Sequence, residues 1–290
     1  MKIDVVCPLF EAAEEIDGFL TRLQAQTGVE IQKKVFAVTK SADFERTVEK
    51  LQAAGCDYFL VEKEDFSHSL TRQKAIYEHC ESDVVIMMSQ DVVLENEDAL
   101  LLLASAVSAE VPYAYGRQIC KKKTIEFYVR NKNYGSESLI VSQADVEKMQ
   151  LKAFFASDAF SAYHRPTFLS LGGYDDEHMM MSEDMYYAKK VIDAGLKKAY
   201  VAEAVVEHSH KLTLKQLYNR YYQTGIWFAN HPQFDNYKTT DSGLKLATYV
   251  FKKALLHFNI PVLFRFIPDM LARYLGMKKG KKCKPEVQNA

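Results

Sequence analysis

The first half of the chain alternates short apolar segments with amphipathic ones, and this alternation limits the fold more than any other sequence feature. Apolar runs typical of strands lie at residues 3–9, 33–38, 57–61 and 84–88. Each is followed by a stretch with apolar residues at helical spacing, at residues 11–26, 44–54, 69–80 and 100–107. Gly55 is typical of a helix end. Repeated strand–helix–strand units predict an α/β fold with a mostly parallel central sheet and helices on both faces.

The stretch DVVIMMSQDVVLEN, residues 83–96, indicates where such a sheet would bind a ligand. Its apolar run is typical of a strand buried on both faces, and it ends on Ser89, Gln90 and Asp91. Ligands of parallel α/β sheets bind at the carboxyl ends of the strands, where polar side chains can reach them. We therefore expect these three side chains at the binding edge of the sheet.

The composition argues against several classes of protein. The 290 residues are 48% hydrophobic and 26% charged, as in a globular protein with one large domain or one domain and an extension. A net charge of -1 argues against a general nucleic-acid binder. Five cysteines without a CxxC pair suggest neither a zinc site nor a disulfide framework, and they favour the reducing cytoplasm. We expect no signal peptide and no transmembrane helix.

Several segments resemble, in the right order, the inverting nucleotide-sugar glycosyltransferases of family 2, which have the GT-A fold. These segments are VVCPLFEAAEEIDGFLTRLQAQ at the first strand, MMSQDVVLEN at the metal-binding strand end, GGYDDEHMMMSEDMYYAKKVIDAGLKKAYV on the acceptor side, and VVEHSH at the late histidine. A narrower resemblance, to bacterial rhamnosyltransferases that use dTDP-L-rhamnose, is carried by DFSHSLTRQKA, SQD, YGRQ, HSHKLTLKQLYNRYYQTG and ARYLGMKKGK.

The resemblance implies an inverting, metal-dependent glycosyltransferase of bacterial cell-surface polysaccharide synthesis. It would move L-rhamnose from dTDP-L-rhamnose to a lipid-diphosphate-linked saccharide. The nearest alternative is the same fold with another nucleotide sugar, such as a UDP-hexose. A nucleotidyltransferase would need a Gly-rich phosphate loop after the first strand, and CPLFEAAEE has none. A non-catalytic scaffold of a polysaccharide assembly complex is a further alternative, against which Asp91, Asp184 and the late histidines speak.

The implied cofactor is Mg²⁺ or Mn²⁺, which would neutralise the charge on the leaving nucleotide diphosphate. Asp91 offers an oxygen ligand, and His208 or His210 offers a nitrogen, which Mn²⁺ tolerates. Ser89 stands where the family's DxD motif has its first Asp, so Asp91 is the acidic ligand that this motif retains. Without the resemblance, Asp91 also fits a turn or helix N-cap, and the two histidines fit a solvated loop.

Inversion at an anomeric carbon is one in-line displacement, so a carboxylate must accept the proton of the attacking hydroxyl. The resemblance assigns this base to Asp184, and contacts with the acceptor or the sugar to Glu183 and Asp158. The same stretch also fits the start of a capped helix, with Ser182 at the N-cap and acids favoured by the helix dipole. The methionines at residues 179–181 fit a mobile acceptor loop or buried packing.

The resemblance also implies a donor pocket. Phe10 would pack on the base, and Arg72 would meet a phosphate at a helix start. Arg117 and Gln118 of YGRQ would bind sugar hydroxyls. Further members are Pro8, Glu11, Phe66, His68, Thr71, Ser89 and Gln90. Without the resemblance, Arg72 fits a surface salt bridge and the segment after the first strand an ordinary turn.

One departure from the family concerns the end of the second strand. The family often has an Asp there that holds the base or the ribose, but this chain has VTKSAD. Thr39 and Ser41 offer hydroxyls to a pyrimidine or a deoxyribose instead. The missing carboxylate suits a deoxyribose nucleotide.

The C-terminal part differs in character, so we expect a catalytic domain over residues 1–210 and a helical extension with a basic tail over residues 211–290. Residues 252–284 are rich in Lys and Arg with one acid, Asp269, and residues 260–275 add a broad apolar face. This pattern is typical of membrane-surface binding. It also fits helices packed on the catalytic domain, or on a second subunit in a homodimer. With a lipid-linked acceptor, we expect a cytoplasmic protein bound peripherally to the inner face of the cell membrane.

Overall fold

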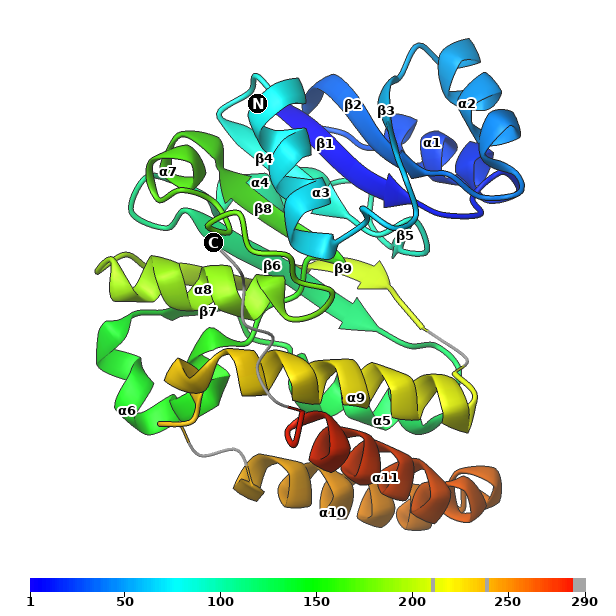
Figure 1. Ribbon diagram of the computed structural model, residues 1–290, viewed down its shortest axis with the longest axis vertical. Coiled ribbons are helices and arrows are strands. Elements are labelled where there is room, and N and C mark those ends of the chain that lie inside the picture. The colour runs from blue at the N-terminus through cyan, green and yellow to red at the C-terminus, as the bar shows by residue number, and fades with distance from the viewer. Residues whose placement is uncertain (210–211, 238–239, 284–290) are drawn as a thin grey trace.

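The computed structural model of the protein describes residues 1–209, 212–237 and 240–283, and one nine-stranded sheet forms the centre of this described part (Figure 1). The strands lie in the order β3-β2-β1-β4-β8-β6-β9-β5, and β7 also pairs with β9. Their bounds are β1 (Lys2–Leu9), β2 (Glu30–Thr39), β3 (Asp57–Val61), β4 (Val84–Met88), β5 (Val93–Leu94), β6 (Tyr113–Ile119), β7 (Leu139–Val141), β8 (Phe160–His164) and β9 (Lys198–Glu207). The four predicted apolar runs are strands β1 to β4.

The two halves of the sheet differ in strand direction. Strands β3, β2, β1 and β4 are parallel, so their carboxyl ends meet at one edge. Strand β8 then pairs antiparallel with both β4 and β6, while β6 and β9 are parallel to each other. The expected α/β fold with a mostly parallel central sheet is confirmed. The reversal at β8 has no counterpart in the sequence pattern of the first half.

Helices cover both faces of the sheet (Figure 1). Their bounds are α1 (Ile16–Gln24), α2 (Phe44–Ala53), α3 (His68–Lys74), η1 (Ala75–His79), α4 (Ala99–Ser105), α5 (Ile125–Asn133), η2 (Gln143–Asp145), α6 (Val146–Met149), η3 (Gln150–Phe154), α7 (Arg165–Ser170), α8 (Glu183–Asp193), α9 (Leu214–Asn230), η4 (Pro232–Phe234), α10 (Thr240–Leu256) and α11 (Ile260–Gly280). The second predicted helix ends just before Gly55, whose φ of +62° is a conformation that glycine adopts at little steric cost. The predicted helix at 69–80 is α3, which continues as the π-helical turn η1.

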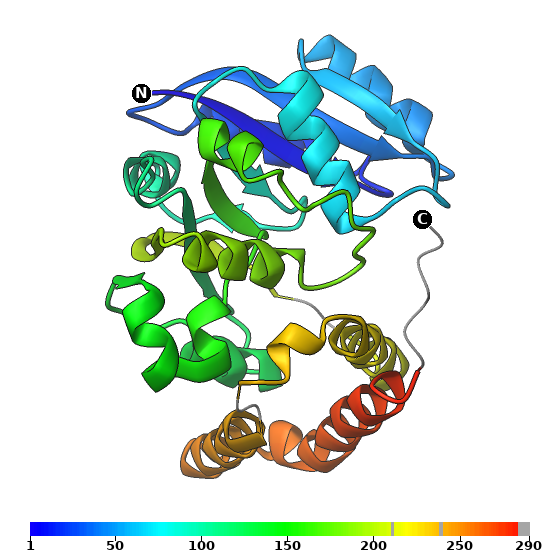
Figure 2. The same cartoon turned by 60° about the vertical axis from the view of Figure 1, so that its left-hand side comes forward.

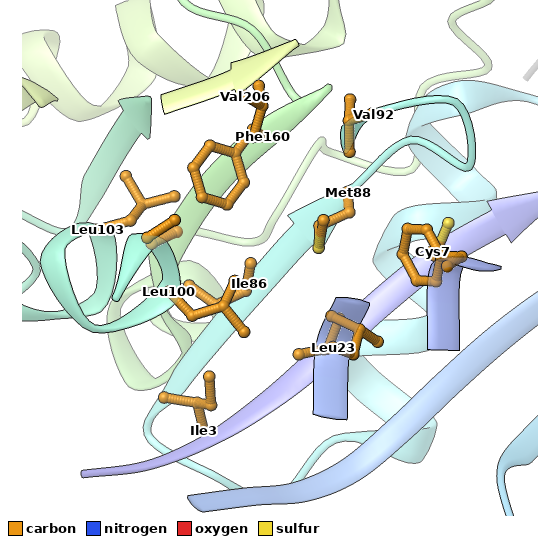
Figure 3. Close-up of a cluster of buried hydrophobic side chains, with 14 of the residues drawn as sticks. Ile3, Cys7, Leu23, Ile86, Met88, Val92, Leu100, Leu103, Phe160 and Val206 are labelled. Carbon is orange, nitrogen blue, oxygen red and sulfur yellow. The ribbon is translucent and has the colours of Figure 1, made fainter. Parts of the chain in front are cut away.

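The first hydrophobic core holds strand β4 in place. All five residues of β4 are buried. Ile86 and Met88 share one face of the strand and join a buried cluster with Leu100 and Leu103 of α4 and Leu23 of α1 (Figure 3). Burying each such side chain contributes about 1.5–3 kcal/mol relative to leaving it exposed. The strand therefore ends at a fixed point, which sets the position of the three polar residues that follow it.

The second core, on the other side of the sheet, is rich in tyrosine. Tyr113, Tyr163, Tyr174 and Tyr187 are fully buried around Phe168. Their rings pack mostly edge-on or tilted, with centroids 4.7 to 6.0 Å apart. Buried tyrosines need partners for their hydroxyl groups. Several of these hydroxyls donate to one carboxylate, Asp158, which is described in the next subsection.

The C-terminal helices α9, α10 and α11 form a layer beside α5, at the end of the molecule away from β2 and β3 (Figures 1 and 2). Helices α9 and α11 touch through their backbones. A Cβ on Gly280 would lie 2.1 Å from Tyr222 O, and one on Gly276 would lie 2.4 Å from Tyr218 O. A third apolar cluster joins α5 to α10 and α11. The described part of the extension is therefore docked on the rest of the chain.

Helix α11 also carries exposed apolar side chains on the side away from this third cluster. Phe264 is 81% exposed and Ile267 is 66% exposed, whereas Asp269 of the same helix is only 4% exposed. Within the described ranges, no helix combines the length and the hydrophobicity that a membrane span requires.

Candidate active site

A cavity of about 650 Å³ opens at the carboxyl edge of the sheet, where β1, β2 and β4 end. This volume is typical of a site for a small molecule. Its walls are formed by Pro8, Leu9, Phe10, Thr39, Lys63, Phe66, His68, Arg72, Ser89, Gln90, Asp91, Ser157, Asp158, Ala159, Met180, Met181, Ser182, Glu183, Asp184, His208 and Arg220. The cavity brings together most of the residues that the sequence assigned to the donor, the metal and the base.

Asp91 and His208 face each other at this edge. Asp91 lies in the turn after β4, where Val92 N–H donates to Ser89 O at 3.3 Å. His208 follows β9, and its backbone N–H donates to Ile119 O of β6 at 3.0 Å. The Nε2 atom of His208 lies 3.4 Å from Oδ2 of Asp91. Burial lowers the pKa of His208, although the interaction with Asp91 opposes this. Both atoms are suitable ligands for a divalent cation.

The donor set fits a cation that is held partly by its substrate. Within the described residues, no group of three or more His, Cys, Asp or Glu side chains converges as a metal site. Mg²⁺ and related ions are commonly bound through one or two protein ligands together with substrate phosphates. Asp91 and His208 match that pattern. His210, the second histidine proposed from the sequence, lies outside the described residues.

The YGRQ segment lies behind the cavity wall. Gln118 is buried, and its Oε1 lies 2.8 Å from Nδ1 of His208. Neither Gln118 nor Arg117 lines the cavity. The geometry therefore gives no support to the predicted contact of these two side chains with sugar hydroxyls, and Gln118 contacts His208 instead.

Arg72 and Glu183 form an ion pair that is buried at the cavity wall. Arg72 Nη1 also lies 3.1 Å from Nδ1 of His68. Burial lowers the pKa of His68 to about 3, with the charge of Arg72 adding to the effect, so this ring is neutral. The alternative of a surface salt bridge for Arg72 is wrong, because this side chain is only 3% exposed. Glu183 largely neutralises the charge that Arg72 would offer to a phosphate.

Asp184 lies in the first turn of α8 and lines the cavity. Burial raises the pKa of Asp184 well above its usual range, and the negative charges of Glu183 and Asp158 raise it further. Burial also raises the pKa of Glu183 to about 7, although Arg72 opposes this. Ser182 stands at the N-cap of this helix, as the sequence predicted. Its side chain makes no capping hydrogen bond, and its φ of +65° turns the chain into the helix.

Asp158 lies at the cavity wall above the tyrosine-rich core. Its carboxylate accepts hydrogen bonds from the hydroxyls of Ser161, Tyr113, Tyr163 and Tyr174, at 2.6 to 2.9 Å. Four protein donors therefore satisfy this buried carboxylate, as a buried charge requires. It provides a fixed negative charge near Asp184.

The region that the sequence assigned to the nucleotide is formed by the ends of β1, β2 and β4. Phe10 N–H donates to Gln90 Oε1 at 2.8 Å, and Gln90 Nε2 donates to Phe10 O at 2.9 Å. The Phe10 side chain is 39% exposed, and the ammonium group of Lys63 lies 5.7 Å from its ring centroid. Thr39 also lines the cavity, and its buried hydroxyl has no hydrogen-bond partner among the described residues. An unpartnered buried hydroxyl facing a cavity suits a polar ligand group.

Besides Arg117 and Gln118, three predicted donor residues do not line the cavity. Ser41 Oγ donates to Asp43 Oδ1 at 2.7 Å. Thr71 is buried within α3. Glu11 is exposed at the turn after β1, with a φ of +50°. The geometry supports an ordinary turn after β1. It places none of these three side chains in the wall of the cavity.

Sequence reasoning missed two basic cavity residues, Lys63 and Arg220. Lys63 follows β3, and Arg220 is on helix α9. The sheet pattern places the end of β3 at the correct edge, so Lys63 could have been found. Arg220 lies in the segment HSHKLTLKQLYNRYYQTG, which carries part of the narrower resemblance, but no local pattern indicated that this helix would reach the cavity.

The segment before α8 is held between α3 and α9. Ser69 Oγ accepts from Met179 N–H at 2.8 Å and donates to Glu177 O. The carboxylate of Glu177 lies 2.8 Å from His231 Nε2, and Trp227 Nε1 donates to Met179 Sδ at 3.3 Å. Met179 is buried packing, whereas the next two methionines line the cavity. The C-terminal layer thus helps to form one wall of the site.

Comparison with curated proteins finds two close relatives. The chain is 34% identical over 289 residues to the O-antigen chain rhamnosyltransferase RfbN of Salmonella typhimurium, covering 97% of this chain and 90% of that protein. It is 36% identical over 229 residues to the O-antigen chain rhamnosyltransferase WbaN of Salmonella anatum, covering 77% of this chain and 71% of that protein. No protein-family model matches the chain.

Two solved structures with a similar fold were determined with nucleotide sugars. The mannosyltransferase PcManGT from Pyrobaculum calidifontis, solved in complex with GDP-Man and Mn²⁺, has a TM-score of 0.62 and 14% identity, covering 97% of this chain and 87% of that one. TarS of S. aureus, solved in complex with UDP-GlcNAc, has a TM-score of 0.57 and 13% identity, covering 97% and 90%. At this level of identity the likeness concerns the fold.

Proposed function

The chain belongs to the O-antigen chain rhamnosyltransferases, glycosyltransferases of polysaccharide synthesis with a GT-A-type fold, and on that premise we propose a specific reaction. The enzyme transfers L-rhamnose from dTDP-L-rhamnose to a lipid-diphosphate-linked saccharide, with inversion and with a divalent metal. The observation that carries this proposal is one cavity that contains both a pair of side chains suited to bind a metal ion, Asp91 and His208, and a separate carboxylate, Asp184.

Asp91 and His208 are the ligands that we propose for Mg²⁺ or Mn²⁺, with His210 as a further candidate. When bound, such an ion supplies positive charge that stabilises the leaving nucleotide diphosphate. Asp91 is fixed by the buried strand β4, and His208 by its backbone bond to β6, so both are positioned before substrate arrives. That PcManGT was solved with GDP-Man and Mn²⁺ supports a divalent ion in this fold.

Asp184 is the base that we propose, because the two neighbouring carboxylates are already engaged. Glu183 is paired with Arg72, and Asp158 accepts from four hydroxyls. The hydrogen bond described for the Asp184 side chain comes from Met185 N–H of its own helix, at 2.7 Å. Its raised pKa makes it a better proton acceptor than an ordinary surface carboxylate. It would take the proton of the acceptor hydroxyl during the displacement.

The nucleotide would occupy the side of the cavity formed by β1 and β2. We propose that Phe10 packs on the thymine and that the hydroxyl of Thr39 bonds the base or the deoxyribose. Lys63 and Arg220, rather than Arg72, are the cations that we propose for the diphosphate, because Arg72 is paired with Glu183. Helix α9 would thereby contribute directly to donor binding.

The test is transfer of labelled sugar from dTDP-L-rhamnose to the lipid fraction of a membrane extract, with the anomeric configuration of the product assigned by NMR. We expect transfer in Mn²⁺ or Mg²⁺, with inverted configuration. Transfer from a UDP-hexose but not from dTDP-L-rhamnose would favour the alternative donor. Absence of both transfer and donor binding would favour the scaffold alternative.

We further propose that residues 1–210 form the catalytic domain and that the extension, residues 211–290, binds an anionic membrane surface at the inner face of the cell membrane. The outward side of α10 and α11 supports this. These helices and the turn between them carry apolar side chains that are 51 to 83% exposed, namely Leu244, Leu255, Leu256, Phe258, Ile260, Phe264, Ile267, Leu271 and Tyr274. Exposed Lys252, Lys278 and Lys279 lie on the same helices. Each Lys or Arg near an anionic leaflet contributes about 1 kcal/mol, so binding should be reversible and salt-sensitive.

The test of membrane binding is co-sedimentation with anionic and with neutral vesicles. Replacing Phe264 and Ile267 by Asn should reduce sedimentation with anionic vesicles, because it removes apolar area from the proposed face. The matched control replaces Leu139 and Ile140, an exposed apolar pair on β7, and should change nothing. Equal sedimentation of both double variants would contradict the proposal. If the wild type instead forms a concentration-dependent dimer that the Phe264 and Ile267 variant does not form, this face would mediate a homodimer.

A further inference from the structure

A line of charged and polar side chains connects helix α11 to His208, the proposed metal ligand. It begins with Asp269 and Arg273 of α11, where Arg273 Nε donates to Asp269 Oδ1 at 2.5 Å. Arg273 Nη2 donates to Glu126 Oε1 of α5 at 3.3 Å. Arg130, one turn after Glu126 on α5, lies 3.7 Å from its other carboxylate oxygen. Two helices thus bring alternating charges towards the sheet.

The line ends at His208 through Gln118. Arg130 Nη1 donates to Gln118 Oε1, and the same oxygen lies 2.8 Å from Nδ1 of His208. On the other side of the ring, Nε2 faces Asp91 at 3.4 Å. The side chains of Arg130, Arg273 and Asp269 are only 6 to 12% exposed. The cost of removing these charges from water offsets most of the attraction between them, even though each is paired. Stability alone therefore does not account for the arrangement.

The network determines which nitrogen of His208 carries the proton. An arginine guanidinium can only donate, so Gln118 must turn its oxygen, not its NH₂ group, towards Arg130. The same oxygen then faces Nδ1 of His208 at 2.8 Å, and an oxygen without a proton can only accept. Nδ1 therefore carries the hydrogen. Arg130 Nη2 also lies within hydrogen-bond distance of Nδ1, at 3.4 Å, and that contact would need Nδ1 as an acceptor. The shorter contact with Gln118, at 2.8 Å, decides in favour of Nδ1–H.

We infer that Arg273, Glu126, Arg130 and Gln118 are positioning residues for His208, and that they hold its Nδ1–H on Gln118 so that Nε2 faces Asp91. The inference rests on the proposed metal role of Asp91 and His208. Partners of this kind fix the orientation of a metal-binding histidine and affect the affinity for the metal. The C-terminal helix α11 is then part of the support of the metal site, in addition to its proposed membrane face.

Metal affinity is the first measurement. Mn²⁺ is titrated into the full-length protein, and free Mn²⁺ is followed by electron paramagnetic resonance without any substrate. Gln118→Met removes the acceptor at similar volume, and we expect the Kd for Mn²⁺ to rise roughly 10- to 100-fold. Gln118→Glu keeps an acceptor for Nδ1–H and should retain affinity close to that of the wild type. Unchanged Mn²⁺ affinity in folded Gln118→Met would overturn the inference.

The far end of the line needs its own pair of variants. Arg273→Met removes one of the two arginine partners of Glu126, and a smaller rise in the Kd is expected because the effect passes through Arg130. The matched control is Arg265→Met on the same helix, since Arg265 donates to Leu212 O and approaches Asp269 but makes no described contact with Glu126. Equal Kd values in these two variants would overturn the role of α11. Should Gln118→Met not fold, Glu126→Gln replaces it, with the same expected direction.

A second measurement does not depend on the metal. Long-range ¹H–¹⁵N NMR of the metal-free protein distinguishes the two tautomers of His208, and we expect Nδ1–H in the wild type and a mixture in Gln118→Met. An Nε2–H tautomer in the wild type would overturn the inference. If the wild type shows Nδ1–H but binds no Mn²⁺, the positioning holds and the proposed metal function fails.

Discussion

Strand β4 and helix α11 are both rich in apolar residues, but they use them in opposite ways. Every residue of β4 is buried, between helices on one side and the tyrosine-rich core on the other. In α11, Phe264 and Ile267 are 81% and 66% exposed. The buried positions of α11 are Val262, Asp269, Gly276 and Gly280.

The difference shows that an apolar pattern in the sequence predicts burial only where the fold places other side chains against it. Strand β4 is flanked by β1 and β8 and is covered on both faces. Helix α11 packs through glycines against α9, through charged side chains against α5, and through only part of its apolar residues in the third cluster. Its exposed apolar side chains form the face that we propose for membrane binding, and its charged side chains belong to the network that we propose to position His208.

The largest effect is expected at the end of β4. Asp91→Asn removes the anionic ligand proposed for the metal, and transfer should fall on the order of 1,000-fold or more, since a metal supplies several kcal/mol to the transition state. The strand itself should stay folded, because the side chain projects from its end into the cavity. Transfer assays with a circular-dichroism control check this. Full activity, or full wild-type activity in excess chelator, would sink the metal assignment.

The proposed base is the next test, on a helix start rather than a strand end. Asp184→Asn should lower kcat by about 100- to 10,000-fold while leaving donor and metal affinity close to wild type, because a general base acts mainly in the transition state. Single-turnover kinetics together with donor titration separate the two quantities. Loss of donor binding would instead make Asp184 a binding residue.

The third prediction concerns how much the contact between α9 and α11 contributes to the stability of the protein. Gly280→Val should destabilise the protein by about 1–3 kcal/mol, because the new side chain would overpack an interface where even a Cβ lies 2.1 Å from Tyr222 O. Gly243→Val on α10 is the matched control, since a Cβ there meets nothing within 4 Å. Urea unfolding measures both variants. If they were equally stable, the helices would not be held by this contact.

The smallest effect concerns pH. The base must be ionised to act, so the raised pKa of Asp184 places the acid limb of kcat/KM above the usual carboxyl range of about 4. Glu183→Gln removes a neighbouring negative charge that raises this pKa, so the limb should move to lower pH. A pH–rate profile of the two proteins checks the direction. A limb that stays in place or moves to higher pH would argue against Asp184 as the titrating group.

Sequence reasoning predicted the sheet edge well and the C-terminal layer poorly. The four parallel strands, the helix end at Gly55 and the position of Asp91 follow from local patterns of apolar residues and turns. The antiparallel strand β8 and the cavity position of Arg220 depend on contacts between distant segments, which no local pattern encodes.

Two side chains are oriented differently from what their residue types suggested. Ser182 stands at the predicted N-cap, but its backbone is left-handed and its side chain makes no capping hydrogen bond. Gln118 lies near the correct strand end, yet its side chain points towards His208 and Arg130 rather than into the cavity. Side-chain direction at a strand end depends on register, which the sequence alone did not fix.

The most direct test of the central claim is a calorimetric titration of dTDP-L-rhamnose into the full-length protein, in Mn²⁺ and in excess chelator, with Asp91→Asn and UDP-glucose as comparisons. We predict binding of dTDP-L-rhamnose in Mn²⁺, much weaker binding in chelator or in Asp91→Asn, and weaker binding of UDP-glucose. Equal affinity with and without the metal would contradict the role of Asp91 and His208, and tighter binding of UDP-glucose would contradict the assigned donor.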